Sequence, residues 1–324
     1  MKEAILKLLK NRRLEYVSGE EICKSLDVSR TAVWKHIQAL REDGYGIEAR
    51  PRLGYMLTSI PDRLYPGEIM DGLSTRFIGR NIFYYDSVSS TNDLAKELVR
   101  KGAPEGSLVV SEEQTGGKGR LGRRWYSPKH RGIFFSLILY PPTSPSEAAR
   151  VTMIAAVAYA AAIQNETGIT AGIKWPNDLL VDGKKICGIL SEMSAEMDKI
   201  NYLVIGTGLN VNHRLEDFSA EVRSTATSLK IKTADTFSRV RLLQALLAEF
   251  ERWYEIWLAE GFAPVLAKFK EMSVSLNCPV RIHALNKSWD GWAEDVDEEG
   301  ALLLRLPDGE LQRLVSGEVS LRIS

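Results

Sequence analysis

Apolar residues at helical spacing predict two short helices near the N-terminus of the chain. Val33, Ile37 and Leu40 lie on one face of a helix expected over residues 30–42. Before it, the capping-box sequence SGEE at 18–21 predicts the start of a shorter helix. Two such helices joined by the tight turn LDVS are typical of a helix-turn-helix, whose second helix enters a DNA major groove. An αα-hairpin with a solvated polar face fits the same pattern.

The next alternation of apolar and polar residues favours the DNA-binding interpretation. YGIEARPRLGYMLTS, residues 45–59, is typical of a hairpin or wing beside the second helix. Arginines in such a wing contact phosphates, which position a protein on DNA without reading its sequence. The pattern changes in the proline-containing stretch SIPDRLYPGEI, so we place a linker at about residues 60–64. The candidate DNA contacts lie in the wing and, together with Arg41, on the outer face of the second helix: Arg30, Thr31, Lys35, Gln38, Arg50 and Arg52.

The rest of the chain has the composition of an ordinary soluble protein. Its length of 324 residues suggests two or three domains, and an apolar fraction of 44% with a charged fraction of 26% argues against disorder. The longest apolar run, VTMIAAVAYAAAI at 151–163, is too short and too rich in alanine to span a bilayer. We therefore expect a cytoplasmic protein without membrane contact. Three widely separated cysteines give neither a disulfide framework nor a zinc spacing.

The net charge of the chain is zero, so only the local distribution of charged residues is informative. Between Gln114 and Arg131 there are six basic residues and no acidic residue. Within this stretch, GGKGRLGRRW at 116–125 contains the spacing G-x-G-x-x-G of dinucleotide and kinase loops. A strand-like run, IFFSLILY, follows where a dinucleotide fold needs a helix, and kinase and P-loop sequences are missing. What remains is a pliable basic loop that suits an anionic ligand, or a plain solvated loop.

A second group of candidate residues surrounds a predicted hairpin. In KWPNDLLVDGKKICGIL, the Asp-Gly pair predicts a type I′ turn, which puts Asp178 on the first strand and Lys185 on the returning strand. Lys174 precedes a Trp-Pro pair that cannot continue a helix. Each lysine alone is better explained as solvated surface, whereas their combination favours a site.

Three later segments complete the pattern. In VIGTGLNVN we expect a strand end followed by glycines, which offers the backbone amides of Gly206 and Gly208 to a ligand. RSTATSLKIKT at 223–233 is either a loop that becomes ordered or an exposed turn. From about residue 273, short apolar runs separated by turns such as DEEG and PDGE predict a small β-barrel. The acidic residues of this segment either keep it soluble or help to orient a partner protein.

These motifs together resemble the bacterial family of bifunctional biotin protein ligases and biotin operon repressors. SSTND at 89–93, GGKGRLGRRW, KWPNDLLVDGKKICGIL and GTGLNVN occur in the family's order and approximate spacing, and the resemblance covers essentially the whole chain. It implies a multidomain α/β fold. We expect a winged helix-turn-helix DNA-binding domain at residues 1–62, an α+β biotin/lipoate-type ligase core resembling class II aminoacyl-tRNA synthetases at 63–272, and an SH3-like C-terminal barrel at 273–324.

The resemblance also implies where the ligands bind. Biotin and its adenylate are expected to contact Ser90, Thr91, Asn92, Gln114, Lys118, Gly119, Arg120, Lys185, Gly206 and Gly208, with Arg120 and Lys185 catalytic. ATP is expected at Arg123, Trp125, Lys174, Asp178 and Asn210. One position departs from the family, whose loop usually reads Gly-Arg-Gly-Arg, because Lys118 replaces the first arginine. Lysine keeps the charge but loses the bidentate fork of arginine.

The reaction that the resemblance implies has two steps. The carboxylate of biotin attacks the α-phosphate of ATP and releases pyrophosphate; a lysine amine of the biotin carrier protein of acetyl-CoA carboxylase, or of a related carboxylase, then attacks the anhydride. Mg²⁺ is expected to arrive with ATP, since no cluster of His, Cys and carboxylates suggests a resident metal site. The adenylate is also expected to act as a corepressor that favours a homodimer on operator DNA. A ligand-sensing transcription factor without ligase activity and a lipoate-type ligase are the alternatives.

Overall fold

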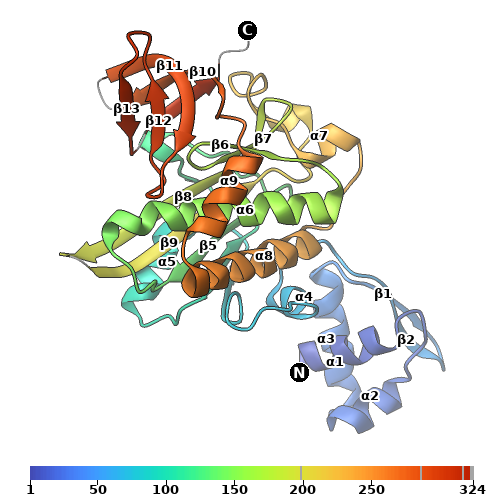
Figure 1. Ribbon diagram of the computed structural model, residues 1–324. Helices are drawn as coiled ribbons and strands as arrows, with labels where there is room; N and C mark the ends of the chain where they lie inside the picture. The colour runs from blue at the N-terminus through green and yellow to red at the C-terminus, as the bar shows by residue number, and fades with distance from the viewer. Residues whose placement is uncertain (198, 285–286, 316, 322–324) are drawn as a thin grey trace. The chain divides into compact units, whose positions relative to one another are not determined.

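The computed structural model describes residues 1–197, 199–284, 287–315 and 317–321 of the chain (Figure 1). Their contacts divide the chain into two compact units, Met1–Arg63 and Leu64–Ser324. The division falls inside the linker expected at residues 60–64. The C-terminal β domain, which we expected as a third part, belongs to the same compact unit as the central domain.

The first unit contains three helices followed by a two-stranded hairpin. Its elements are α1 (Lys2–Asn11), α2 (Gly19–Leu26), α3 (Arg30–Glu42), β1 (Gly46–Arg50) and β2 (Gly54–Ser59). Ser18 caps α2 by accepting a hydrogen bond from the Glu21 amide (3.1 Å), and Ser29 caps α3 by accepting one from the Ala32 amide (3.2 Å). The predicted helix-turn-helix and wing are confirmed, whereas α1 was not among the predicted elements.

The second helix of this motif packs as its spacing predicts, with one exception. Val33, Ile37 and Leu40 are buried. Arg41, which we expected on the outer face, instead donates hydrogen bonds from Nε (3.0 Å) and Nη2 (2.7 Å) to the carbonyl oxygen of Ile47. That prediction was wrong because the end of α3 lies beside β1, and the Arg41 guanidinium joins the two elements.

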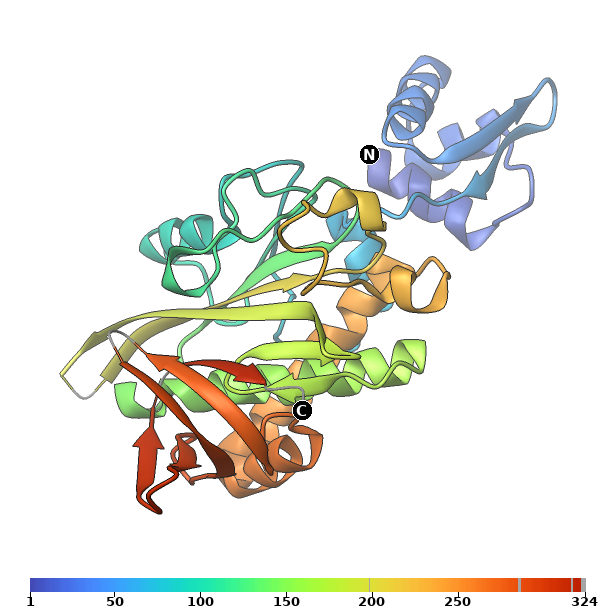
Figure 2. The ribbon, with the colours of Figure 1, turned by 90° about the horizontal axis from the view of Figure 1, so that it is seen from above.

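A seven-stranded mixed sheet forms the middle of the second unit (Figures 1 and 2). Its order is β3-β4-β5-β9-β8-β7-β6, with β3 and β4 parallel and the other neighbours antiparallel. Both turn residues of the predicted hairpin, Asp182 (φ 49°) and Gly183 (φ 73°), have the positive φ that a type I′ turn requires. The strands are β3 (Ile82–Tyr85), β4 (Leu108–Ser111), β5 (Ile133–Leu139), β6 (Gly172–Lys174), β7 (Asp178–Val181), β8 (Lys184–Glu196) and β9 (Lys199–Leu209).

Helices cover both faces of this sheet. They are α4 (Pro66–Met70), α5 (Thr91–Arg100), α6 (Ala148–Thr167), α7 (Leu229–Thr233), α8 (Arg239–Glu260) and α9 (Ala263–Met272). Helix α5 packs Leu98 against Val109 and Val204. Because successive strand residues point to opposite faces, Leu108 and Val110 belong to the other layer, where α6 lies with α8 and α9 beyond it (Figure 1).

Helix α6 is the core helix of the second unit. With the turn before it, Pro145–Thr167 is long and apolar enough to cross a membrane by length and composition, so the length argument made from the sequence was wrong. However, 72% of its apolar window is buried inside the protein. It packs between the sheet and α8, and this burial accounts for its composition.

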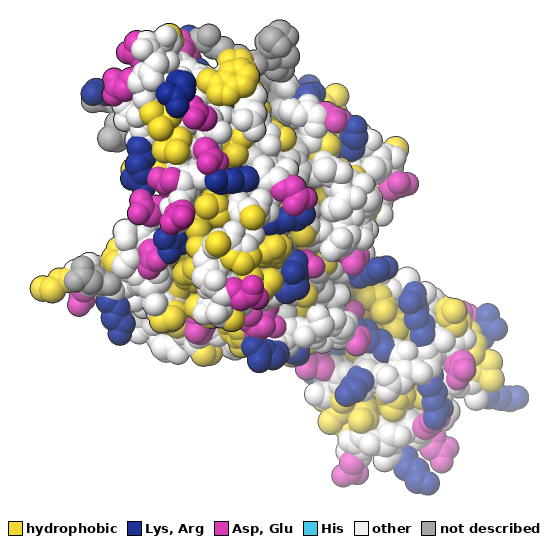
Figure 3. Space-filling model, viewed as in Figure 1, with side chains coloured by type: hydrophobic (Ala, Val, Ile, Leu, Met, Phe, Trp, Pro, Cys, Tyr) yellow, Lys and Arg dark blue, Asp and Glu magenta, His cyan; other side chains and the backbone are white. Residues whose placement is uncertain are grey.

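The short apolar runs correctly predicted strands in the C-terminal part, where the described residues form a second, five-stranded antiparallel sheet with β13 and β14 at its ends. Its closure into the expected SH3-like barrel stays a prediction. Its order is β13-β12-β11-β10-β14, with strands β10 (Cys278–Ala284), β11 (Lys287–Val296), β12 (Leu302–Arg305), β13 (Leu311–Leu314) and β14 (Glu318–Leu321). Its buried residues continue the core of the central domain, and Trp175 donates a buried hydrogen bond to the carbonyl oxygen of Gly300 (3.0 Å). Acidic and basic side chains lie interspersed on the face seen in Figure 3, and Asp290 and Glu294 form ion pairs with Arg281 and Arg305.

A buried ion pair holds the beginning of the second unit. Glu112 follows β4, Arg239 begins α8, neither side chain has exposed area, and Arg239 Nη1 lies 2.7 Å from Glu112 Oε2. The Leu64 amide donates to Glu112 Oε1 (2.8 Å), and His130 Nδ1 lies 3.0 Å from Oε2. Burial alone would raise the pKa of the Glu112 carboxyl, but the charge of Arg239 and the hydrogen bonds from His130 and Leu64 outweigh it and lower the pKa.

We expect Arg239→Met to lower the free energy of unfolding by about 3–5 kcal/mol, because it leaves a buried carboxylate without its counter-charge. Arg241→Met is the matched control on the same helix, since the Arg241 side chain is 75% exposed and pairs with Glu166. The R241M substitution should lower the free energy of unfolding by about 1 kcal/mol or less. Denaturant titration at neutral pH measures both variants, and equal stability of the two would contradict the prediction.

The stability difference between wild type and R239M depends on pH. Because the folded-state pKa of Glu112 is lowered, its stabilising contribution is fully present above the unfolded pKa of a glutamate and is lost as pH falls through the folded value. The stability difference between wild type and R239M should therefore narrow in acid.

Candidate active site

The second unit contains a cavity of about 870 Å³ above the central sheet. This volume lies within the range of roughly 300–1,000 Å³ that is usual for small-molecule sites. The cavity is lined by every residue that we expected to bind biotin, its adenylate or ATP: Ser90, Thr91, Asn92, Gln114, Lys118, Gly119, Arg120, Arg123, Trp125, Lys174, Asp178, Lys185, Gly206, Gly208 and Asn210. The individual roles of these residues stay predictions.

The floor of the cavity is strand β9. Gly206 and Gly208 lie inside this strand, paired with β5 on one side and β8 on the other, and not after its end as expected. The expectation that their amides face a ligand was wrong, because the backbone groups of a central strand are taken up by its neighbours. The glycines matter for their missing side chains: a Cβ at Gly206 would lie 2.0 Å from Asn92 Oδ1, and one at Gly208 would lie 2.2 Å from Trp125 Nε1.

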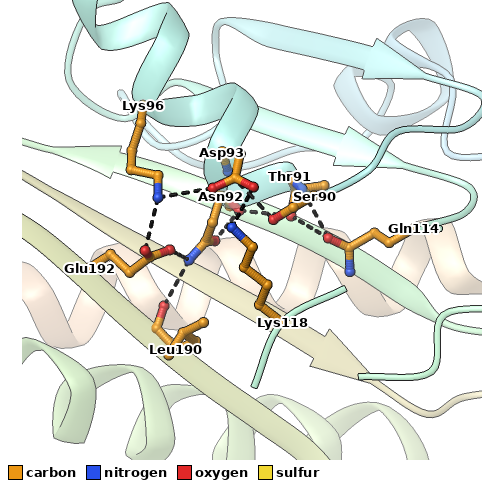
Figure 4. Close-up of polar contacts among 10 residues, drawn as sticks. Ser90, Thr91, Asn92, Asp93, Lys96, Gln114, Lys118, Leu190 and Glu192 are labelled. Carbon is orange, nitrogen blue, oxygen red and sulfur yellow. Dashed lines mark hydrogen bonds and ion pairs between the residues drawn. The ribbon is translucent and has the colours of Figure 1, made fainter. Parts of the chain in front are cut away.

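One end of the cavity is a buried polar cluster at the beginning of α5 (Figure 4). Ser90 caps the helix, while the amide and Oγ1 of Thr91 donate to Gln114 Oε1 (2.9 and 3.1 Å). Ser136 of β5, which the sequence did not single out, lies 2.8 Å from Thr91 Oγ1 and 2.6 Å from Asn92 Oδ1. These mutual hydrogen bonds hold neutral donors and acceptors at fixed positions, which suits an uncharged polar ring.

The basic loop crosses the cavity, and its four cations have different partners. Lys118 Nζ lies 2.6 Å from Asp93 Oδ2, and Arg123 forms an ion pair with Glu318 of β14. Arg124 donates to the carbonyl oxygen of Thr115 (2.8 Å). These contacts hold the loop to the residues around the cavity, so they favour a binding loop over a plain solvated loop.

Arg120 differs from the other loop cations. It donates to the neutral amide oxygen of Asn177 (3.0 Å), and burial lowers the pKa of its guanidinium, although the charges of Asp178 and Glu318 partly offset this. An arginine remains protonated in proteins despite such a shift. Arg120 is thus a partly desolvated cation that an anion would stabilise.

The opposite end of the cavity is cationic. Lys185 Nζ lies 2.6 Å from Asp178 Oδ1 and 5.2 Å from the ring centre of Trp125, and Lys174 Nζ lies 3.6 Å from Asp178 Oδ2. Arg120 adds a third cation to this end, and the charge of Asp178 acts on it. Within the described part of the chain, no acceptor meets the buried indole N–H of Trp125. A nucleotide phosphate fits this end, because it supplies negative charge and acceptor oxygens.

One wall of the cavity comes from the segment 223–233, which the sequence left open as an ordering loop or an exposed turn. The Lys185 amide donates to the carbonyl oxygen of Thr225 (2.8 Å), and the Thr227 amide donates back to the carbonyl oxygen of Lys185 (2.9 Å). Asn210 Nδ2 also donates to the carbonyl oxygen of Thr227 (3.0 Å). The segment is therefore bound to the hairpin strand through Thr225 and Thr227, while residues 223–225 form an exposed turn, so each interpretation holds for part of it.

The first unit presents most of its predicted DNA contacts to solvent. Trp34, which was not predicted, is 56% exposed. It lies one helical turn from both Arg30 and Gln38 on α3, so it shares their face. The predicted contacts were all charged or polar residues, although the spacing that buries Val33 and Ile37 also places Trp34 away from the buried face of α3. Arg30, Thr31, Lys35, Arg50 and Arg52 are exposed, and Gln38 is half-buried.

Known families match all three parts of the chain. Residues 84–210 match the Biotin/lipoate A/B protein ligase family, residues 2–56 an HTH domain, and residues 275–322 the Biotin protein ligase C terminal domain. The structure is similar to that of a biotin protein ligase from Aquifex aeolicus in complex with biotin and ATP. That similarity has a TM-score of 0.66 and 28% identity, and it covers 76% of this chain and 100% of the other.

Two relatives extend this similarity. The biotin–[acetyl-CoA-carboxylase] ligase of Paracoccus denitrificans is 32% identical over 68% of this chain and 92% of its own length. The bifunctional ligase/repressor BirA of Bacillus subtilis is 39% identical over 99% of this chain and 98% of its own length. Because this likeness spans the helix-turn-helix, the cavity and the C-terminal sheet, the chain belongs to the family of bifunctional biotin protein ligase/repressors.

Proposed function

We propose that the protein joins biotin to a lysine of a carboxylase carrier protein through an adenylate, and that the same adenylate controls DNA binding by the first unit. The observation that carries the proposal is that the two ends of one cavity differ in charge. Neutral hydrogen-bonding groups lie around Thr91 at one end, cations lie around Asp178 at the other, and the glycine-rich loop crosses between them. A ligand with an uncharged ring at one end and a carboxylate near a phosphate at the other matches this arrangement.

In the first step, the residues of the chain bring two anions together. Thr91 and Gln114 hold the biotin ring, so the carboxylate points toward Lys185. Lys185 and Arg120 neutralise the charge that grows on the α-phosphate as the carboxylate oxygen bonds to phosphorus and pyrophosphate leaves. Stabilisation of this developing charge and positioning supply most of the acceleration in such transfers. Mg²⁺ bound to ATP would supply further charge stabilisation on the departing phosphates.

In the second step, a carrier lysine attacks the anhydride carbon, and AMP leaves. The glycine-rich loop and the segment 223–233 keep water away from the anhydride until the amine arrives. The relative from Paracoccus denitrificans is named for acetyl-CoA carboxylase, which supports the biotin carrier protein of that enzyme as the acceptor. The amine attacks in its neutral form after its ammonium group has lost one proton to solvent, and the nitrogen loses a second proton to solvent as the bond to AMP breaks.

The repressor role uses the first unit. Helix α3 enters a major groove with Arg30, Thr31, Lys35 and Gln38, while Arg50 and Arg52 of the wing contact phosphates. We propose a cytoplasmic homodimer in the adenylate-bound state, so that two such helices meet two half-sites. A bifunctional relative that is 39% identical supports this second role.

The first experiment compares biotin and lipoate as acids for ATP-dependent pyrophosphate release, followed by transfer to a biotin carrier domain. Biotin alone should support both steps. Activation of lipoate instead would assign the cavity to the lipoate-type alternative. DNA binding that responds to biotin without pyrophosphate release would identify a sensor that lacks ligase activity.

We expect Lys185→Gln to lower the rate of adenylate formation by a factor of about 10² to 10³, since it removes one charge from the phosphate end. Lys184→Gln is the matched control, because Lys184 is the neighbouring exposed residue and does not line the cavity. Its rate should stay near that of wild type. Single-turnover measurement of pyrophosphate release tests both, and near-normal release by K185Q would remove this lysine from the mechanism.

We expect Trp34→Ala to weaken binding to a preferred DNA sequence about tenfold or more, as loss of a base contact does, with little change in the salt dependence. Lys35→Ala should weaken binding to all sequences and reduce the salt slope by about one. A preferred sequence is first selected from random DNA with wild-type protein, biotin and ATP. Uniform weakening by W34A across sequences would assign Trp34 to the fold of the unit instead.

A further inference from the structure

The ion pair between Lys118 and Asp93 joins the glycine-rich loop to helix α5 (Figure 4). Lys118 Nζ lies 2.6 Å from Asp93 Oδ2, and Asp93 is in the first turn of α5, directly after Asn92. Lys118 lines the cavity, whereas Asp93 does not. The ammonium group of Lys118 is therefore held from outside the cavity lining.

The pair continues into a chain of charged contacts. Asp93 Oδ1 lies 3.0 Å from Lys96 Nζ, which lies 2.9 Å from Glu192 Oε1 of β8. Asn92 Nδ2 donates to Glu192 Oε2 (2.7 Å), and Asn92 is a cavity residue. The contacts thus connect the loop to the cavity wall through three side chains outside the lining, as Figure 4 shows.

The charges in this chain balance. Two cations, Lys118 and Lys96, alternate with two carboxylates, Asp93 and Glu192. Partial burial would raise the pKa of Asp93, but the hydrogen bonds and charges of Lys118 and Lys96 outweigh it and lower the pKa, so the carboxylate is ionised at neutral pH. The charge of Lys118 already has a partner, unlike the charge of Arg120, whose partner is a neutral amide.

We propose that Asp93 is a positioning residue that fixes the glycine-rich loop over the cavity through Lys118. Lys118 then anchors the loop and leaves the reacting phosphate to Arg120 and Lys185. This role explains how lysine serves where the family resemblance leads us to expect arginine, since one ammonium group contacts one carboxylate oxygen without a bidentate fork. The inference rests on the proposed ligase function for its effect on the adenylate, but not for its effect on the loop.

The first test uses the ligand-free protein. Asp93→Asn should make the backbone amides of residues 116–124 exchange hydrogen about twofold to fivefold faster at low salt, the effect of losing an exposed ion pair. Asp93→Glu keeps the charge and should stay closer to wild type. Asp86→Asn is the matched control, because Asp86 forms an exposed ion pair with Lys129 and neither residue lines the cavity. D86N should leave exchange in the loop unchanged.

The second test measures dissociation of biotinyl-AMP from the full-length protein. D93N should release it about twofold to fivefold faster than wild type at low salt, and the difference should shrink at about 1 M salt, where charges are screened beyond ~3 Å. Lys118→Gln should have a similar effect, and the double variant should be no worse than either single variant, because both remove the same interaction.

The outcomes separate the two claims. Unchanged exchange in the loop of D93N at low salt, or additive effects of D93N and K118Q, would overturn the positioning role. A wild-type protein that forms no adenylate would overturn the proposed function, while the exchange experiment would still decide whether Asp93 holds the loop.

Discussion

The cavity depends on two positions in the middle of the central sheet that carry no side chain. Asn92 and Trp125 approach Gly206 and Gly208 so closely that a Cβ at either glycine would overlap them. Thr207, between the glycines, points its hydroxyl to the opposite face, where it lies 3.4 Å from the Tyr159 hydroxyl. The alternation of a strand thus clears one face for a ligand and keeps the other face packed.

The electrostatics of the site follow from this geometry. Because the floor is backbone, the charged groups come from the walls around it. Asp178 pairs with Lys174 and Lys185, Glu318 pairs with Arg123, and Asp93, which lies outside the lining, pairs with Lys118. A phosphate entering here exchanges one partner of a cation for another, and the energy gained is the difference between the two contacts. Because this difference is smaller than the energy of a new ion pair, the exchange limits the affinity for phosphate and allows the product to leave.

Local features of the site could be predicted from the sequence, whereas long-range pairings could not. The Asp182-Gly183 turn and the bounds of α3 depend on residues that are neighbours in the chain, so their spacing sufficed. The position of Gly206 inside a strand depends on β5 and β8, which no local pattern specifies. Arg41 was misplaced for the same reason, because the carbonyl group that it binds belongs to the next element.

The Glu112 pair limits where the chain can be shortened. Its carboxylate accepts a hydrogen bond from the amide of Leu64, the first residue of the second unit. A protein that lacks the DNA-binding unit but begins at or before residue 63 retains this donor. A protein that begins a few residues after Leu64 lacks this donor and leaves an oxygen of the buried Glu112 carboxylate without it, two positions before the cavity residue Gln114. A shortened ligase that keeps residue 63 therefore also keeps the hydrogen bonding of its buried Glu112 carboxylate intact.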